Sequence, residues 1–204
     1  MPNHFTTILT VQAKGVEHVS DLMAFIRKYT DLDGYAPIAP PNTKHEFSDA
    51  DRPERETEIR LSTAFRPMPL KYVGTVDGSH SVTADDGLTW YSWAIQNWGT
   101  KWGTYDESHM ISDDRIVIEM QSAWGPPGEL IKFISEAYPN LSFEANGYDE
   151  GDDDLYYMSW DNGEYREVNL GVWRGFDEAE EDWFEHCDPS QGLVKEPPSW
   201  DKSA

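Results

Sequence analysis

The spacing of hydrophobic positions predicts a strand followed by a helix at the start of the chain. Apolar residues and threonines mix through residues 5–12, a composition typical of a strand. In residues 16–29 the apolar side chains recur three or four positions apart, as they do along one face of a helix. Residues 31–56 carry four prolines and no sustained period, so we expect a long loop there.

The middle of the chain predicts a second strand and a second helix. Apolar and polar residues alternate through 58–65, as in a strand with one buried face. Further on, Asp85 or Asp86 can cap the beginning of a helix that runs to about Trp98, and Gly99 is a suitable C-terminal stop. This helix would be part of an insertion at about 67–110.

The second half returns to strands around one further helix. Residues 115–123 alternate again and predict a strand, and two consecutive prolines favour a helix over 130–138. Asn162 and Gly163 form a dipeptide typical of a two-residue hairpin turn. The remaining expected strands are 141–146, 155–160 and 164–170, with an acidic loop at 148–154 between the first two.

This order of elements predicts an α+β protein with a ferredoxin-like fold. Without the insertion, the elements follow the βαββαβ order, in which two helices cover one face of an antiparallel sheet. We therefore expect one domain over 1–175 that carries an inserted Trp-rich helix. Apolar residues at helical spacing between 176 and 187 predict a short acidic C-terminal helix, followed by a polar tail to residue 204.

The chain is strongly acidic, and the acidity is uneven. Its 38 acidic and 16 basic residues give a net charge of −22. Residues 1–100 hold −4 of this charge and residues 101–204 hold −18. Such a field repels nucleic acids and anionic membranes and attracts basic surfaces. We therefore expect no direct nucleic-acid or membrane binding, and an acidic surface that only keeps the protein soluble is the alternative.

The cysteine content and the absence of targeting signals predict a cytoplasmic protein. The single cysteine, Cys187, cannot form an internal disulfide or a cysteine zinc site, in keeping with a reducing compartment. The first residues lack the pattern of a signal peptide, and no apolar run approaches the ~18 residues of a membrane span.

Several short motifs resemble a known family. They are Met1-Pro2-Asn3-His4, Trp98-Gly99-Thr100-Lys101-Trp102, Ala123-Trp124-Gly125-Pro126-Pro127, Phe143 and Tyr148-Asp149-Glu150-Gly151. On these residues the chain resembles the YubB-type ferredoxin-like proteins of plasmids and phages, over about residues 1–170. The resemblance implies a ferredoxin-like fold without an iron–sulfur cluster, and a gene carried on mobile elements. It implies no catalytic residues.

The distribution of carboxylates suggests a partner. Residues 144–188 hold 16 acidic residues against Arg166 and Arg174. Carboxylates held on strands and a packed helix could imitate the phosphate spacing of duplex DNA and occupy the basic groove of another protein. We therefore predict an accessory protein that binds a basic host protein, one that handles nucleic acid or acts in defence. The predicted contact residues are Asp149, Glu150, Asp152, Asp153 and Asp154 on the loop and Asp177, Glu178, Glu180, Glu181, Asp182 and Glu185 on the helix.

The tryptophans offer a second hypothesis, a binding protein or enzyme for a nucleotide or sugar. Flat indole rings can stack a base or a sugar, and a lysine beside them can hold an anion. The predicted ligand residues are Trp98, Lys101, Trp102 and Trp124. The competing interpretation is that the tryptophans fill an irregular core and that Lys101 lies over an indole ring as a cation–π partner.

Other chemistry has little support in the sequence. The run of acids at 149–154 lacks the ligand spacing of a calcium loop, and the six histidines show no metal-binding motif, so no metal or other cofactor is expected. No nucleophile elbow or phosphate-binding loop occurs, and acidic neighbours should raise the pKa of the Cys187 thiol. No catalytic residue is predicted.

Overall fold

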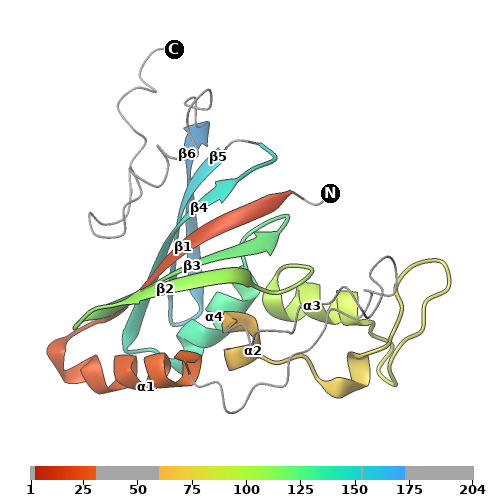
Figure 1. The fold of residues 1–204 in the computed structure, drawn as a ribbon, viewed down its shortest axis with the longest axis horizontal. Coiled ribbons are helices and arrows are strands. Elements are labelled where there is room, and N and C mark those ends of the chain that lie inside the picture. The colour runs from red at the N-terminus through yellow and green to blue at the C-terminus, as the bar shows by residue number, and fades with distance from the viewer. Residues whose placement is uncertain (1–2, 31–59, 153, 173–204) are drawn as a thin grey trace, which may run out of the picture.

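The computed structural model describes residues 3–30, 60–152 and 154–172, which form a six-stranded antiparallel sheet with helices packed against it (Figure 1). The protein is therefore of the α+β class. The strands are β1 (His4–Ala13), β2 (Tyr105–Ile111), β3 (Arg115–Ala123), β4 (Leu141–Asp149), β5 (Asp154–Asp161) and β6 (Glu164–Val172).

The first strand lies inside the sheet, between β3 and β4. The strand order is β2-β3-β1-β4-β5-β6, and all neighbours are antiparallel. The register pairs His4 with Ala123 of β3 and Phe5 with Asp149 of β4. The start of β1, the end of β3 and the turn between β4 and β5 therefore meet at one end of the sheet.

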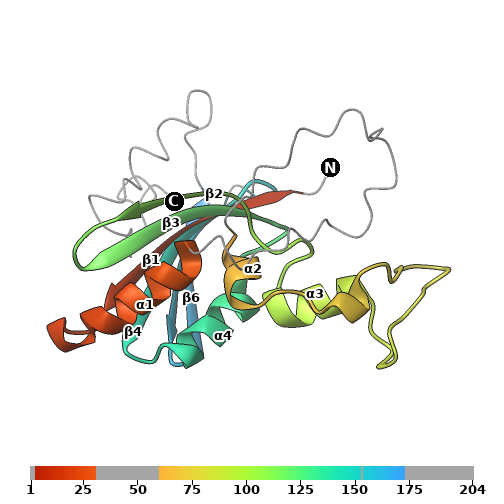
Figure 2. The ribbon, with the colours of Figure 1, turned by 60° about the horizontal axis from the view of Figure 1, so that its bottom comes forward.

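The helices gather on one face of the sheet (Figure 2). Their apolar stripes pack against the inward side chains of the central strands, which produces one continuous core. The helices are η1 (Val16–His18), α1 (Val19–Thr30), α2 (Leu61–Phe65), η2 (Leu70–Tyr72), α3 (Trp90–Trp98) and α4 (Gly128–Ala137). None of the helices within the described ranges is long and apolar enough to cross a bilayer.

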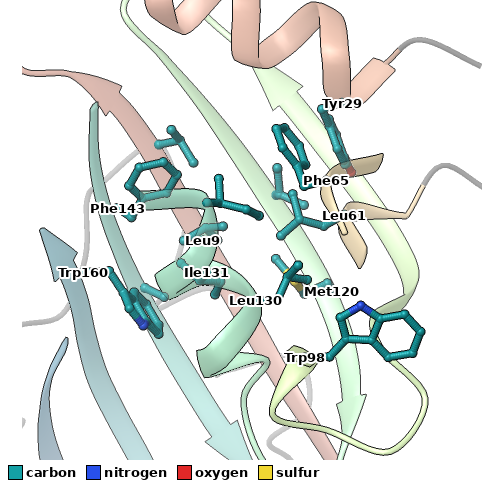
Figure 3. Close-up of a cluster of buried hydrophobic side chains, with 14 of the residues drawn as sticks. Leu9, Tyr29, Leu61, Phe65, Trp98, Met120, Leu130, Ile131, Phe143 and Trp160 are labelled. Atoms are coloured by element: carbon teal, nitrogen blue, oxygen red, sulfur yellow. The ribbon is translucent and has the colours of Figure 1, made fainter. Parts of the chain in front are cut away.

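The core is rich in aromatic and branched side chains (Figure 3). Leu130 and Ile131 of α4 are fully buried over the sheet, with Ile131 on the side of Phe143 and Trp160 and Leu130 on the side of Met120. Phe25 of α1 stacks on Phe65 of α2, with 4.8 Å between ring centroids. The helices therefore pack against one another as well as against the strands.

The sequence prediction was wrong for part of the segment 58–65. Residues 61–65 form α2, with Leu61, Ser62 and Phe65 buried, and residues 58 and 59 lie outside the described ranges. Leu61 and Phe65 are four positions apart, a spacing that fits one face of a helix as well as it fits alternation in so short a segment.

Two further predictions need correction. The helix expected from Asp85 or Asp86 begins at Trp90, and its N-cap is Thr89, which forms a reciprocal capping box with Ser92. The insertion predicted at about 67–110 contains no predicted strand beyond its helix, but residues 105–111 form the edge strand β2. Its polar sequence reflects an edge position, because most of its residues are exposed.

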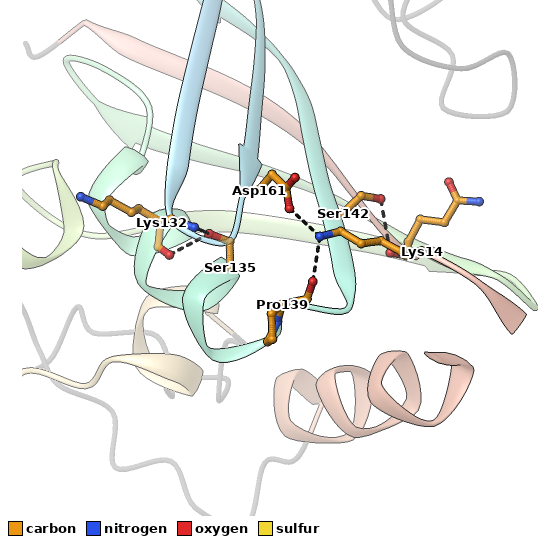
Figure 4. Close-up of polar contacts among 8 residues, drawn as sticks. Lys14, Lys132, Ser135, Pro139, Ser142 and Asp161 are labelled. Carbon is orange, nitrogen blue, oxygen red and sulfur yellow. Dashed lines mark hydrogen bonds and ion pairs between the residues drawn. The ribbon is translucent and has the colours of Figure 1, made fainter. Parts of the chain in front are cut away.

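The turn between β5 and β6 is fixed to α4 and to the end of β1 (Figure 4). The Gly163 N–H donates to Ser135 Oγ over 3.0 Å, and that hydroxyl donates to the Lys132 carbonyl over 2.8 Å. Lys14 Nζ donates to the Pro139 carbonyl over 2.7 Å and pairs with Asp161. The hairpin predicted from Asn162 and Gly163 is confirmed.

Replacing Gly163 with alanine should destabilise the protein by about 1–2 kcal/mol, the typical cost of a left-handed conformation for a residue with a Cβ. Gly163 has φ +84°, and an added Cβ would lie 2.6 Å from Glu136 Oε1. Urea denaturation would measure the loss. Gly125→Ala is the control, because nothing lies within 4 Å of a Cβ there. Equal stability of the two variants would contradict the prediction.

Candidate functional site

The segment Trp98-Gly99-Thr100-Lys101-Trp102 lies between α3 and β2, and its fourth residue, Lys101, is partly exposed. Trp98 is buried, and its Nε1–H donates to the Arg66 carbonyl over 2.9 Å. The Thr100 hydroxyl donates to the Ala123 carbonyl over 2.8 Å and accepts from the Ala123 N–H over 3.1 Å. This hydroxyl therefore extends the hydrogen bonding at the end of β3. Trp98, which was predicted as a ligand residue, belongs to the core.

Two glycines, Gly99 and Gly103, allow the segment around Lys101 to pack closely against its neighbours. Gly99 ends α3 in the left-handed conformation, where an added Cβ would lie 3.1 Å from the Glu129 backbone nitrogen. Gly103 also has positive φ, and an added Cβ would lie 2.7 Å from Ser62 Oγ. The backbone on both sides of Lys101 is consequently held against α2 and α4.

Lys101 lies between two indole rings. Its Nζ is 4.9 Å from the ring centroid of Trp102 and 4.9 Å from that of Trp124. The structure thus brings together three of the four predicted ligand residues and excludes Trp98. Their arrangement is the predicted cation–π contact, with Trp124 in addition to the sequence neighbour.

Trp124 has an unusual backbone conformation and an exposed side chain. It follows β3 with φ +68°, and 51% of its surface is exposed. The Trp124 N–H donates to the Asn3 carbonyl over 3.1 Å, and Ser122 Oγ donates to the Gly125 carbonyl over 2.7 Å. These bonds hold a bulky residue in a region that such residues rarely adopt.

Tyr105 and His4 continue the aromatic cluster across the sheet. Tyr105 Oη lies 2.8 Å from His4 Nδ1, and the Tyr105 ring contacts the Trp102 ring edge-on. Burial raises the pKa of Tyr105 to about 12, and the charges of Asp106 and Glu150 act in the same direction. Tyr105 therefore keeps its proton at neutral pH. The sequence did not indicate that these two residues meet, because only the β1–β3–β2 pairing brings them together.

The loop predicted over 148–154 is shorter in the structure, because β4 reaches Asp149 and β5 begins at Asp154. We call Asp149, Glu150, Asp152 and Asp154 the acidic turn, and it lies on the other side of the β1 terminus. Asp149 Oδ1 accepts the Gly151 N–H over 2.8 Å, and Glu150 Oε2 accepts the His4 N–H over 2.9 Å. Asp154 Oδ2 accepts from Asn169 Nδ2 over 2.9 Å. Asp152 is exposed. Three carboxylates of this turn are thus held in position by hydrogen bonds.

The aromatic cluster and the acidic turn flank the same two residues. Trp124 is bonded to Asn3 from the β3 side, and Glu150 is bonded to His4 from the β4 side. Because neighbouring strands are about 4.8 Å apart, strands β3 and β4 are separated by roughly 10 Å at this end. We call this region the sheet-end surface, made of His4, Lys101, Trp102, Tyr105, Trp124, Asp149, Glu150, Asp152 and Asp154.

The other predicted contact residues lie outside the described part of the chain. They are Asp153, Asp177, Glu178, Glu180, Glu181, Asp182 and Glu185, with the expected helix at 176–187. Within residues 3–30, 60–152 and 154–172, no group of three or more histidine, cysteine or acidic side chains could hold a metal ion.

Glu107 is a partly buried residue with an enclosed carboxyl group, and the sequence did not single it out. A bulge between Tyr105 and Ser108, with Asp106 at φ +50°, turns Glu107 toward the helical layer. Its oxygens accept the Leu61 N–H over 2.8 and 3.0 Å, and Oε2 accepts the Tyr29 hydroxyl over 2.9 Å. Burial raises the pKa of Glu107 to about 7, although these hydrogen bonds, a bond from Thr104 and the charge of Arg60 oppose the shift.

No family model matches the chain, and no curated protein matches it. Among solved structures, the chain is similar to the crystal structure of a protein api92 from Yersinia pseudotuberculosis, assigned to the family DUF1281. The two are 11% identical with a TM-score of 0.47, over 85% of this chain and 99% of that one. A likeness of this strength says nothing about function.

Proposed function

We propose that this protein is a plasmid- or phage-encoded accessory protein that binds a basic host protein through an acidic, DNA-mimicking surface. The partner would handle nucleic acid or act in defence, in the host cytoplasm. The observation that supports this best is the β4–β5 turn. Asp149, Glu150 and Asp154 are fixed by hydrogen bonds to Gly151, His4 and Asn169, so their charges need little further ordering on binding.

The proposal includes a fold. We propose that β1, α1, β2, β3, α4 and β4 form a ferredoxin-like unit, and that β5 and β6 extend its sheet past β4. The strand order β2-β3-β1-β4 and the helices on one face support this arrangement. In it, the extension carries the acidic turn at the start of β5, beside the aromatic cluster. The resemblance to the YubB-type proteins supports the origin on a mobile element.

Neutralising the acidic residues should weaken the complex and reduce its salt dependence. The partner would first be captured from host lysate at low salt and identified. Exposed charge pairs contribute about 0.2–1 kcal/mol each, so removing five of them should weaken binding at least about fivefold at low salt. The first variant carries Asp149→Asn, Glu150→Gln, Asp152→Asn, Asp153→Asn and Asp154→Asn. Asparagine at 149 keeps an acceptor for the Gly151 N–H, so the turn should persist.

Two further variants complete this measurement. One neutralises the six acids at 177–185. The matched control removes five exposed charges away from the turn, by Glu17→Gln, Asp77→Asn, Asp85→Asn, Asp113→Asn and Glu164→Gln. The control should bind like the wild type across a salt series. Unchanged affinity after both acidic clusters are neutralised would contradict the proposal.

Competition with DNA tests the mimicry separately. If the acidic surface occupies the partner's nucleic-acid groove, a short DNA duplex and this protein should exclude each other on that partner. Fluorescence anisotropy of labelled duplex, with this protein as competitor, would measure the exclusion. A ternary complex of partner, duplex and this protein would show that the surface binds elsewhere.

A further inference from the structure

The exposed tryptophan at position 124 adds strain to the fold and contributes little to its packing. A bulky residue at positive φ is strained, and such residues cluster at binding sites. Trp124 has φ +68°, and half of its surface faces solvent. A glycine would adopt this backbone more easily and would leave the core intact. The position therefore presents an indole ring to solvent.

The lysine beside Trp124 has free hydrogen-bond donors. Among the described residues, Lys101 forms no ion pair and no hydrogen bond, although the protein has 38 acidic residues. An ammonium group has three hydrogen-bond donors. An aromatic face attracts its charge but does not accept a hydrogen bond as a carboxylate does. Lys101 is thus a localised positive charge, set between two aromatic rings in an otherwise acidic protein.

The frame that carries these side chains is rigid. Two hydrogen bonds join Thr100 to Ala123. Lys101 and Trp124 are the next residues after these two, so the bonded pair holds their backbones side by side. Gly99 and Gly103 fix the chain on either side of Lys101 by packing against α4 and α2. A site whose groups are held in place before binding loses less entropy when a ligand arrives.

We propose that Lys101, Trp102 and Trp124 bind a nucleoside monophosphate, with the base stacked on the exposed Trp124 ring and the phosphate on the Lys101 ammonium. Base-on-tryptophan stacking and a hydrogen bond from a charged donor both contribute to nucleotide affinity. The Trp124 ring and the Lys101 ammonium lie next to each other, as the base and the phosphate do in a mononucleotide. This site would bind an anionic ligand, whereas the acidic residues would bind a basic protein. The nucleotide proposal therefore does not depend on the proposed function.

The surrounding charge favours a single nucleotide over a strand. Glu150 lies on the far side of His4 from Trp124, and Asp149 and Asp152 follow in the same turn. Each further phosphate of a strand would be repelled by this acidic region and by the net charge of −22. Among Lys101, Trp102 and Trp124 there is no second cation to bind it. We therefore expect oligonucleotides to bind more weakly than adenosine monophosphate.

Nuclear magnetic resonance of the indole N–H groups would test the site. The protein has nine tryptophans, and substitution by phenylalanine assigns the signals of Trp102 and Trp124. Adenosine monophosphate should shift these two signals before the others. Lys101→Gln should weaken the monophosphate about tenfold, the loss expected for a bond of about 1.4 kcal/mol, and leave adenosine unchanged. No shift with the monophosphate, or no effect of Lys101→Gln, would overturn the proposal.

The chain provides a matched control pair and a second variant. The Arg66 guanidinium lies 4.4 Å from the ring centroid of Phe133, also partly exposed, so Phe133→Leu removes another aromatic–cation contact. It should leave the affinity unchanged, and an equal loss there would contradict the site. Trp124→Gly should lose binding but stay folded, because glycine relieves the positive φ. Retained binding in folded Trp124→Gly, or tighter binding of an oligothymidylate, would also overturn the proposal.

Discussion

Trp98→Ala is expected to lower the free energy of unfolding by about 3–5 kcal/mol, the usual range for a buried tryptophan. Only 6% of Trp98 is exposed, and its ring meets Trp93 edge-on with 5.1 Å between centroids. The substitution also leaves the Arg66 carbonyl without its Nε1–H donor. Because total stabilities are about 5–15 kcal/mol, such a loss should be evident as a lower midpoint in urea.

Two tryptophan variants distinguish this role from a ligand site. Trp98→Phe keeps an aromatic ring but not the bond to Arg66, and we expect a loss of about 1–2 kcal/mol. Trp124→Ala removes a half-exposed indole and should change stability by less than about 1 kcal/mol. If Trp98→Ala and Trp124→Ala proved equally stable, the assignment of Trp98 to the core would be wrong.

The strands with one strongly apolar face were predictable from the sequence. The pattern in 115–123 persists over nine residues, and β3 occupies those positions with Ile116, Ile118 and Met120 buried. Residues 61–65 were not predictable, because five residues with apolar positions four apart fit either period. Strand β2 has few buried residues, so its place was set by pairing with β3, which no local pattern encodes.

The candidate site was also only partly predictable from the sequence. The lysine and tryptophans of residues 98–102 were visible as a motif, but the sequence could not show which tryptophan is buried. Trp98 is the last residue of α3 and lies in the core, and Trp124 takes its place as the second ring at Lys101. Tyr105 and Glu107 were overlooked because their surroundings come from residues far away in the sequence: His4 for one, Tyr29 and Leu61 for the other.

The contribution of Glu107 to stability should fall as the pH rises from about 4.5 to about 7. Burial raises the pKa of this carboxyl from 4.5 to about 7, so in this interval the folded protein keeps a proton that the unfolded chain has lost. The contribution is complete below pH 4.5 and is lost as the pH passes the folded value. At about 1.4 kcal/mol per pH unit, the interval corresponds to about 3 kcal/mol.

Glu107→Gln should remove this dependence, because an amide does not ionise and its oxygen can still accept the Leu61 N–H. Other ionisable groups of the chain also change charge between these pH values, so the informative quantity is the difference between variant and wild type, from urea denaturation at pH 4.5, 6 and 8. Between pH 4.5 and pH 8, we expect the free energy of unfolding of the variant to rise by about 3 kcal/mol relative to that of the wild type. Glu119→Gln, a carboxylate on strand β3, controls for the change in net charge. Parallel profiles of Glu107→Gln and wild type would show that the Glu107 carboxyl is ionised at no cost in the folded protein, and that the bulge in β2 orients a carboxylate that binds Leu61 and Tyr29 as an anion throughout.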